Sequence, residues 1–173
     1  MPERRPGPWR QLRAIGPLPA TVAIVIPALL VALGGVEPGF GLPAGAAAAT
    51  IALGAIAAGA GLRLAAGTIA LFANVGEGTL APWDPTRRLV VHGPYRRVRN
   101  PMITGVALVL LGEGLILGSV PILIELGVFA AINAIYMPVV EEPGLERRFG
   151  DEYAEYKRAV PRWIPRREPW TPA

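Results

Sequence analysis

The stretch of sequence that organises this chain runs from Arg87 to Gly105 and reads RRLVVHGPYRRVRNPMITG. Within it, a Gly-Pro turn is followed by a tyrosine and three arginines. The Asn100-Pro101 pair closes the basic run, and proline suits the first position of a helix, where its missing N–H costs nothing. Apolar sequence lies on both sides. This pattern fits a membrane anchor, and it equally fits a site for an anionic, nucleotide-like ligand at the bilayer surface.

Charge is distributed very unevenly over the 173 residues, of which 52% are hydrophobic. Between Ala14 and Gly76 the only charged residues are Glu37 and Arg63, and residues 102–140 contain only Glu113 and Glu125. A soluble helical protein would carry a polar stripe along each helix. The composition therefore predicts an all-α integral membrane protein, and the length is that of one domain, residues 1–173.

Four segments are apolar enough to cross a bilayer. These predicted spans are residues 15–36, 44–62 with an extension to 74, 102–117 and 121–140. Gly118 and Ser119 leave room only for a tight turn, so the last two spans should form an antiparallel hairpin. Small residues such as Gly54, Ala58 and Gly61 would let helix backbones approach closely. Whether the long second segment is one helix or two stays open.

The remaining sequence is polar. Residues 75–101 form a long loop, and residues 142–160 have apolar side chains at helical spacing, which predicts an amphipathic helix on the membrane. Basic clusters flank the spans, as expected of cytoplasmic loops. Four crossings then place both termini and the long loop on the cytoplasmic side of the inner or cell membrane, with Arg63 at its boundary.

Several function classes are excluded by composition. The net charge of +4 comes from residues flanking apolar spans, and no nucleic-acid-binding module is present. There is no cysteine, hence no disulfide framework and no thiol nucleophile, and the single His92 rules out a histidine metal cluster.

Two motifs resemble those of one membrane methyltransferase family, which includes isoprenylcysteine carboxyl methyltransferases and, more distantly, phospholipid N-methyltransferases. The first is LVVHGPYRRVRNP, residues 89–101. The second is a glutamate pair at Glu141 and Glu142, then FGDEYAEY at 149–156 and VPRWIP at 160–165. The resemblance covers about residues 60–167.

The resemblance implies S-adenosylmethionine as cofactor, S-adenosylhomocysteine as product, and a lipid or lipid-linked acceptor that enters from the bilayer. Carried over by position, the cofactor contacts would be Arg87, Arg88, Leu89, Val90, Gly93, Tyr95, Asn100, Pro101, Met102, Ile103 and Glu141. The implied catalytic residues are Glu141, Glu142, Arg99 and Asn100. No metal is implied.

The chain also departs from the family pattern. Asn100 replaces the usual histidine, and Ile103 an often-found tyrosine. Met137 stands where the prenylcysteine enzymes carry an arginine that suits the substrate carboxylate. The acceptor expected first is a prenylcysteine-like or isoprenoid carboxylate, and the alternative is the amine of a phosphatidylethanolamine-type phospholipid.

The residue types fit this chemistry. Methyl transfer from a sulfonium requires binding, alignment and exclusion of water more than acid–base groups. A carboxylate such as Glu141 suits the cofactor's ammonium, and Tyr95 suits its adenine or sulfonium.

Plainer interpretations remain beside this one. The arginines could be simple membrane anchors, and the glutamate pair could be the start of a helix. A transport or proton-relay protein would instead use Glu113 and Glu125 with Asn133 in a shared cavity, because carboxylates inside spans are costly. A scaffold that binds anionic lipid through its arginines is a third possibility.

Overall fold

The computed structural model describes residues 17–75 and 89–171, and every regular element in these two ranges is helical. In chain order they are α2 (Pro17–Ala20), the π-helical η1 (Thr21–Val25), α3 (Ile26–Gly34), the 3₁₀ turn η2 (Pro38–Gly41), α4 (Ala44–Val75), η3 (Gly93–Arg96), α5 (Pro101–Leu117), α6 (Val120–Tyr136), the π-helical η4 (Met137–Glu141), α7 (Glu142–Phe149) and α8 (Asp151–Ala159).

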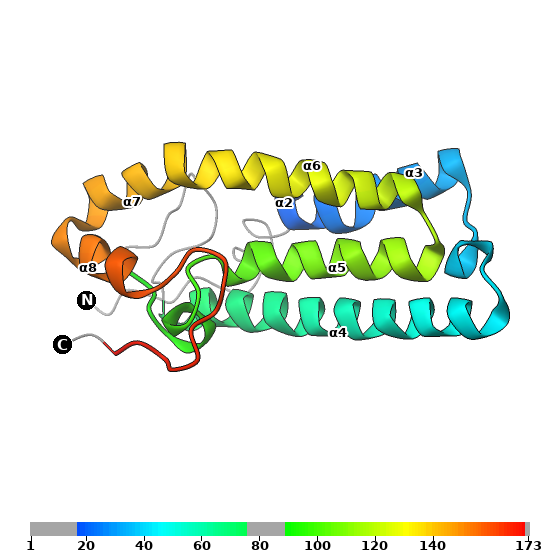
Figure 1. The fold of residues 1–173 in the computed structure, drawn as a ribbon. Coiled ribbons are helices and arrows are strands. Elements are labelled where there is room, and N and C mark those ends of the chain that lie inside the picture. The colour runs from blue at the N-terminus through cyan, green and yellow to red at the C-terminus, as the bar shows by residue number, and fades with distance from the viewer. Residues whose placement is uncertain (1–16, 76–88, 172–173) are drawn as a thin grey trace.

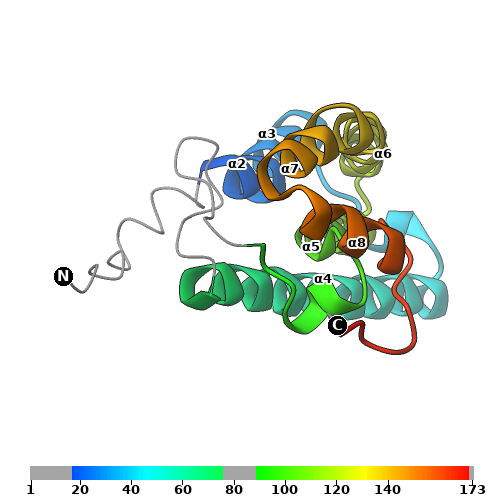
Figure 2. The ribbon, with the colours of Figure 1, turned by 90° about the vertical axis from the view of Figure 1, so that its left-hand side faces the viewer.

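The bundle is layered around α5, which lies between α4 on one side and α3 with α6 on the other (Figures 1 and 2). Three segments are long and apolar enough to cross a membrane: Thr21–Gly41, Ala44–Leu71 and Val120–Phe149. Helix α5 has only 17 residues, about 25 Å, slightly less than the hydrocarbon core. It nevertheless contains more buried residues than α3 or α6, because neighbours cover it on both sides. The all-α membrane fold predicted from the sequence is confirmed.

Helix α4 is a single continuous helix of 32 residues, which settles the question the sequence left open. It packs along α5 through glycine and alanine. A Cβ atom added to Gly61 would lie 2.6 Å from the carbonyl oxygen of Gly105, and one added to Gly112 would lie 2.6 Å from Ala58. No side chain fits at these contacts, so the two backbones touch directly, as the small residues predicted.

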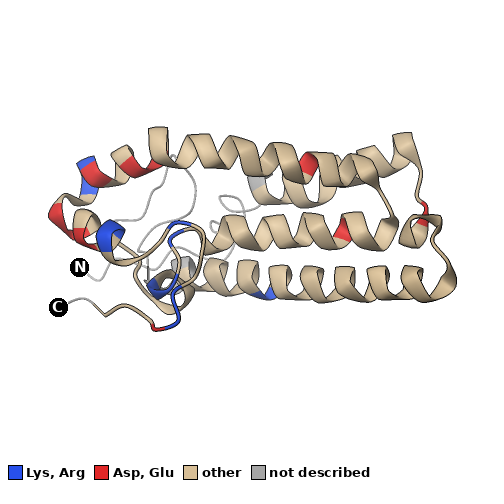
Figure 3. Ribbon diagram, in the orientation of Figure 1, with Lys and Arg blue, Asp and Glu red and all other residues tan. Residues whose placement is uncertain are grey.

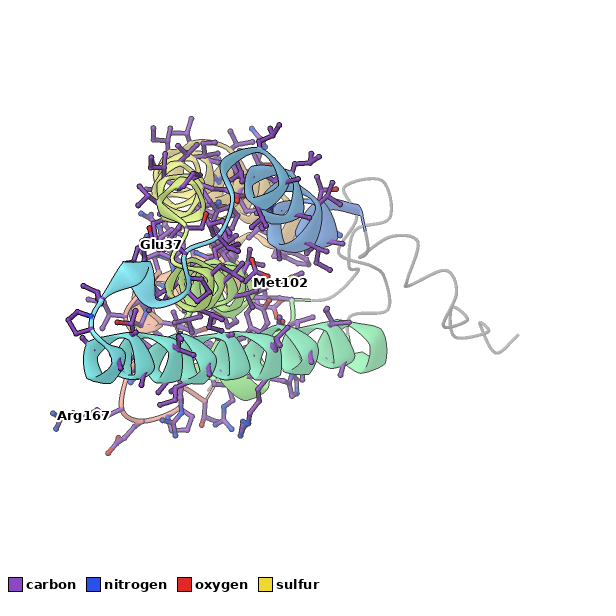
Figure 4. All side chains as sticks on the ribbon, turned by 90° about the vertical axis from the view of Figure 1, so that its right-hand side faces the viewer. Glu37, Met102 and Arg167 are labelled. Atoms are coloured by element: carbon purple, nitrogen blue, oxygen red, sulfur yellow. The ribbon has the colours of Figure 1, made fainter. Side chains whose placement is uncertain are left out.

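At one end of the bundle, the connection between α3 and α4 closes over the last turn of α5 (Figure 4). The Glu37 N–H donates to the carbonyl of Leu117 at 3.0 Å. Gly118 follows with φ 61°, and a Cβ there would collide with the Glu37 carbonyl oxygen. Glycine is therefore required for the turn, and the predicted hairpin of α5 and α6 is present.

The apolar core of the bundle is small and joins α5, α6 and the first helical segment. Leu110 and Ile122 are fully buried, Val106 beside them is nearly so, and side chains of η1 and α3 pack against this group. The first segment contains Pro27, and the π turn η1 lies directly before it. Proline cannot donate to the preceding turn, which accounts for an irregular hydrogen-bonding pattern at this point.

The polar elements gather at the opposite end of the bundle, where Figure 3 shows most of the charged residues, on α7, α8 and the loop before α5. The segment 142–160, expected as one amphipathic helix, is divided into α7 and α8 at Gly150. Its φ of 54° with ψ −130° is incompatible with a continuous helix. A glycine after the last turn of a helix is a common stop signal, and here it folds α8 back across the end of the bundle.

Candidate functional site

The C-terminal segment, residues 160–171 (the strap), runs across the described part of the basic loop, residues 89–100. Three backbone hydrogen bonds join them. Arg99 N–H donates to Pro161 at 2.9 Å, Arg166 N–H to Arg97 at 2.9 Å, and Trp170 N–H to Arg96 at 2.8 Å. The two motifs that the sequence resemblance is based on are therefore in direct contact.

An aromatic core holds this end together. The buried side chains of Val91, Tyr153, Tyr156 and Val160 pack against one another, with Trp170 beside them. The Tyr156 hydroxyl donates to the Tyr95 carbonyl at 2.8 Å. Burial raises the pKa of Tyr153 and of Tyr156. These tyrosines stay neutral and serve as packing groups with one polar contact each.

Glu142 lies at the centre of a charged cluster. Its side chain is 4% exposed, and it forms an ion pair with Arg99 Nη1 at 2.8 Å. Arg162 binds it with two bonds, from Nε to Oε1 at 2.6 Å and from Nη2 to Oε2 at 3.0 Å. Lys157 Nζ is 3.4 Å from Oε2. This two-pronged arginine–carboxylate geometry is the strong form of a charge-assisted hydrogen bond.

The cations of the cluster are held in their charged form. The hydrogen bond to Glu142 raises the pKa of Arg162. A hydrogen bond to Glu146 at 2.8 Å, followed by the charge of Glu142, raises the pKa of Lys157. Lys157 is about one-third exposed, so its contribution is the smallest of the three.

The neighbouring Glu141 has very different surroundings. It is partly buried and makes no hydrogen bond or ion pair with any residue in the described part of the chain. Its charge reaches Tyr95, because burial raises the Tyr95 pKa and both Tyr156 and Glu141 add to the shift. Burial raises the pKa of Glu141 itself, and the positive charge of Arg148 lowers it. Glu141 is thus a partly buried carboxylate that interacts electrostatically with Arg148 and Tyr95 and has no hydrogen bond to a described residue.

The residues leading into α5 complete the region. Asn100 precedes the helix, and its side-chain N–H₂ is 3.5 Å from the carbonyl oxygen of Arg162, a weak contact. Pro101 is buried, while Met102 and Ile103 in the first turn are partly buried. Arg99 also reaches the Tyr153 hydroxyl at 3.4 Å, and its Nε is buried without a partner in the described structure.

The other predicted cofactor contacts are less closely grouped. Val90 is buried, whereas Leu89 packs on the aromatic core. Gly93 is exposed and has φ 54°. Arg87 and Arg88 lie outside the described residues. Met137, where a substrate-binding arginine was considered, is 7% exposed within η4.

Two partners of Glu142 were not predicted to be functional. Arg162 belongs to the VPRWIP motif and lies 20 residues after Glu142. Lys157 belongs to α8 and lies 11 residues after Glu146, its other partner. The presence of Arg162 inside the VPRWIP motif was the one available sign that this arginine has a role. The pairing itself depends on the chain reversal at Gly150, which spacing alone does not reveal.

The carboxylates inside the spans are at the other end of the bundle. Glu113 on α5 and Glu125 on α6 are close enough to interact electrostatically. Both oxygens of Glu125 are buried without a partner among the described residues. Asn133 donates to the Phe129 carbonyl at 2.8 Å, so its amide N–H is used within its own helix.

Comparison with known proteins adds one finding. The sequence model of a family described as phospholipid methyltransferase matches residues 49–152, more than half of the chain. The match runs from α4 through the basic loop, α5, α6 and α7 into α8. Neither a curated protein nor a solved structure matches the chain.

Proposed function

We propose that this chain, which belongs to the phospholipid methyltransferase family, transfers a methyl group from S-adenosylmethionine to a lipophilic acceptor at the cytoplasmic face of the membrane. Family membership makes it a membrane methyltransferase of the phospholipid and isoprenylcysteine type. The cofactor, the acceptor and the orientation are the proposed part.

The observation that carries the proposal is the state of Glu141. A partly buried carboxylate that has no hydrogen bond or ion pair with a described residue, and whose charge acts on the buried Tyr95, fits the ammonium group of the cofactor. S-adenosylmethionine, when bound, supplies a methyl group on a sulfonium that needs no protonation to leave. The residues proposed to hold it are Glu141, Tyr95 and the start of α5 from Asn100 to Ile103.

The role of the protein is then binding, alignment and exclusion of water. Glu141 would fix one end of the cofactor, and the buried Tyr95 would provide an apolar wall. The strap, which crosses the basic loop at Arg97 and Arg99, would keep water out. A carboxylate acceptor needs no acid–base residue for this step, whereas an ammonium acceptor must first give up a proton to a base.

The orientation is inferred from charge. At the α7–α8 end the described residues include arginines of the basic loop, α7, α8 and the strap. At the other end, residues 35–43 and 118–119 contain only Glu37 as a charged residue. Arg63 is level with the start of α5, since Gly61 packs on Gly105. The bias of basic residues toward the cytoplasm therefore supports a cytoplasmic site.

The acceptor proposed first is a prenylcysteine-like or isoprenoid carboxylate. A phospholipid amine is the second candidate, and the buried Met137 favours it. A carboxylate acceptor would find no cation at that position, whereas an amine has no need of one.

Calorimetric titration of the full chain in detergent with S-adenosylhomocysteine tests the cofactor proposal. Wild type should bind saturably. Glu141→Gln keeps the shape of the side chain and removes its charge, so affinity should fall about tenfold to a hundredfold. Glu152→Gln, at an exposed position on α8, is the matched control and should bind like wild type.

Two results would count against the proposal. One is an absence of binding by folded wild type, with and without added lipid. The other is unchanged affinity in Glu141→Gln. Binding that disappears at high salt in wild type and control alike would instead favour the lipid-binding scaffold. Radiolabelled methyl transfer to vesicles containing phosphatidylethanolamine or a prenylcysteine analogue then separates the two acceptors.

A further inference from the structure

Glu141 and Glu142 are adjacent in sequence but differ in what their carboxylates contact. A carboxylate has about four acceptor positions. Both oxygens of Glu142 are engaged: Oε1 accepts from Arg162 and is paired with Arg99, while Oε2 accepts from Arg162 and is paired with Lys157. A cofactor ammonium could bind Glu142 only by displacing one of these cations.

The partners of Glu142 come from separate parts of the fold. Arg99 belongs to the basic loop, Lys157 to α8 and Arg162 to the strap, while Glu142 is the first residue of α7. A single buried carboxylate therefore joins four segments. Next to it, the Arg99 N–H donates to Pro161, so the ionic contacts and the backbone pairing fasten the same crossing.

The charge balance also argues against a cation at this point. Glu142 and Glu146 face Arg99, Arg162 and Lys157, which leaves the cluster with one positive charge in excess. A cofactor ammonium or sulfonium would be repelled by it. Glu141 takes part in none of these contacts, and its carboxylate interacts electrostatically with Arg148 instead.

We propose that Glu142 is a positioning residue that fastens the strap over the basic loop and does not touch the cofactor. The two glutamates then have separate tasks: Glu142 closes this end of the protein, and Glu141 faces the ligand. The second half of this statement rests on the proposed function. The first half does not, and it can be tested without any ligand.

Hydrogen–deuterium exchange of the full chain in detergent measures the closure directly. The reporters are the backbone amides of Arg99, Arg166 and Trp170, which bond across the crossing. In Glu142→Gln these amides should exchange about tenfold to a hundredfold faster, because three cations lose their shared partner. Glu141→Gln, the neighbouring change of the same kind, should leave their exchange unchanged.

A second measurement separates positioning from ligand contact. In Glu142→Gln the dissociation rate of S-adenosylhomocysteine should rise at least about tenfold, while its association rate stays within about twofold, because only closure is lost. Glu142→Asp, which keeps the charge, should restore slow release in part. If Glu142→Gln folds poorly, Arg162→Lys provides the same test, since lysine keeps the charge and loses the fork.

The outcomes are distinct. Unchanged amide exchange in Glu142→Gln, with cofactor binding lost, would overturn the inference and make Glu142 a ligand residue. Accelerated exchange confined to Glu142→Gln and Arg162→Lys supports it. If folded wild type binds no cofactor but Glu142→Gln still loosens the strap, the proposed function fails and the fastening role of Glu142 stands.

Discussion

The helical bundle and the polar end of the molecule are held together by different forces. Inside the bundle, α4 and α5 touch through glycine and alanine, with no charged pair and little room for side chains. At the polar end, the basic loop, α7, α8 and the strap are joined by ion pairs, backbone hydrogen bonds and tilted contacts between aromatic rings. The bundle therefore depends on shape, and the polar end on charge and on tyrosine packing.

The largest loss of stability is expected at the α4–α5 contact, where only close backbone packing holds the helices together. Gly112→Val would place a side chain against Ala58 and the Gly54 carbonyl oxygen, with a Cβ already at 2.6 Å. The helices would have to separate, at a cost of about 3 kcal/mol or more. Thermal unfolding in detergent should show a large loss of stability or no folded protein.

The control for this prediction lies on the same helix pair. Gly59 on α4 has nothing within 4 Å of an added Cβ, so Gly59→Val should change stability by no more than about 0.5 kcal/mol. Equal destabilisation by both substitutions would show that helix propensity matters more than backbone contact.

A smaller effect is expected from charge at the polar end. Arg99→Met removes the contacts to Glu142 and Tyr153 from a side chain that is 10% exposed. Since Arg162 and Lys157 still neutralise Glu142, the loss should be about 2 kcal/mol. Limited proteolysis should cut the strap faster while the bundle stays folded. Arg97→Met, at an exposed position on the same loop, should be cut at the wild-type rate.

The next effect isolates one hydrogen bond. Tyr156→Phe keeps the ring in the aromatic core and removes the donor to the Tyr95 carbonyl. The expected cost is about 1 kcal/mol, seen as a modest drop in unfolding temperature. Tyr136→Phe, at an exposed ring on α6, serves as the control. A drop of several kcal/mol would mean that the Tyr95 carbonyl controls more of the fold than one bond.

The last predicted effect, loss of stability through ionisation of buried tyrosines, does not occur at neutral pH. Burial raises the pKa of Tyr95, Tyr153 and Tyr156 above the ordinary 10.0. The folded protein keeps these hydroxyls protonated where the unfolded chain ionises. The contribution of these three tyrosines to stability is therefore constant below pH 10 and is lost as the pH rises above it. Tyrosinate absorbance should rise together with loss of the polar end, and ionisation without any structural change would contradict this.

The same contrast explains what the sequence could and could not predict. The spans were found because long apolar runs without a polar stripe have few alternatives, and the contacts at Gly54 and Gly61 followed from residue size. The central place of α5 was not predictable, since it is as apolar as the other spans and is the shortest of the four. Its burial comes from which helices lie around it.

At the polar end, the sequence predicted that a helix would form, but it did not predict which segments would contact one another. The glycine at 150 is a stop signal, yet it was placed inside a single helix because the apolar spacing continues through it. The difference between Glu141 and Glu142 is invisible in sequence, because two adjacent carboxylates have the same chemistry. Only the positions of Arg99 and Arg162 in space distinguish them.

The π turn η4, Met137–Glu141, gives this distinction a simple geometric origin. An α-helix advances about 100° per residue, and a π turn holds one residue more than a regular turn. The extra residue sets the rotational phase of α7 relative to α6. Deleting one residue here would rotate α7 by that angle and move the glutamates off their present directions. The different roles proposed for the two carboxylates thus depend on the number of residues between α6 and α7 as well as on the residues being glutamates.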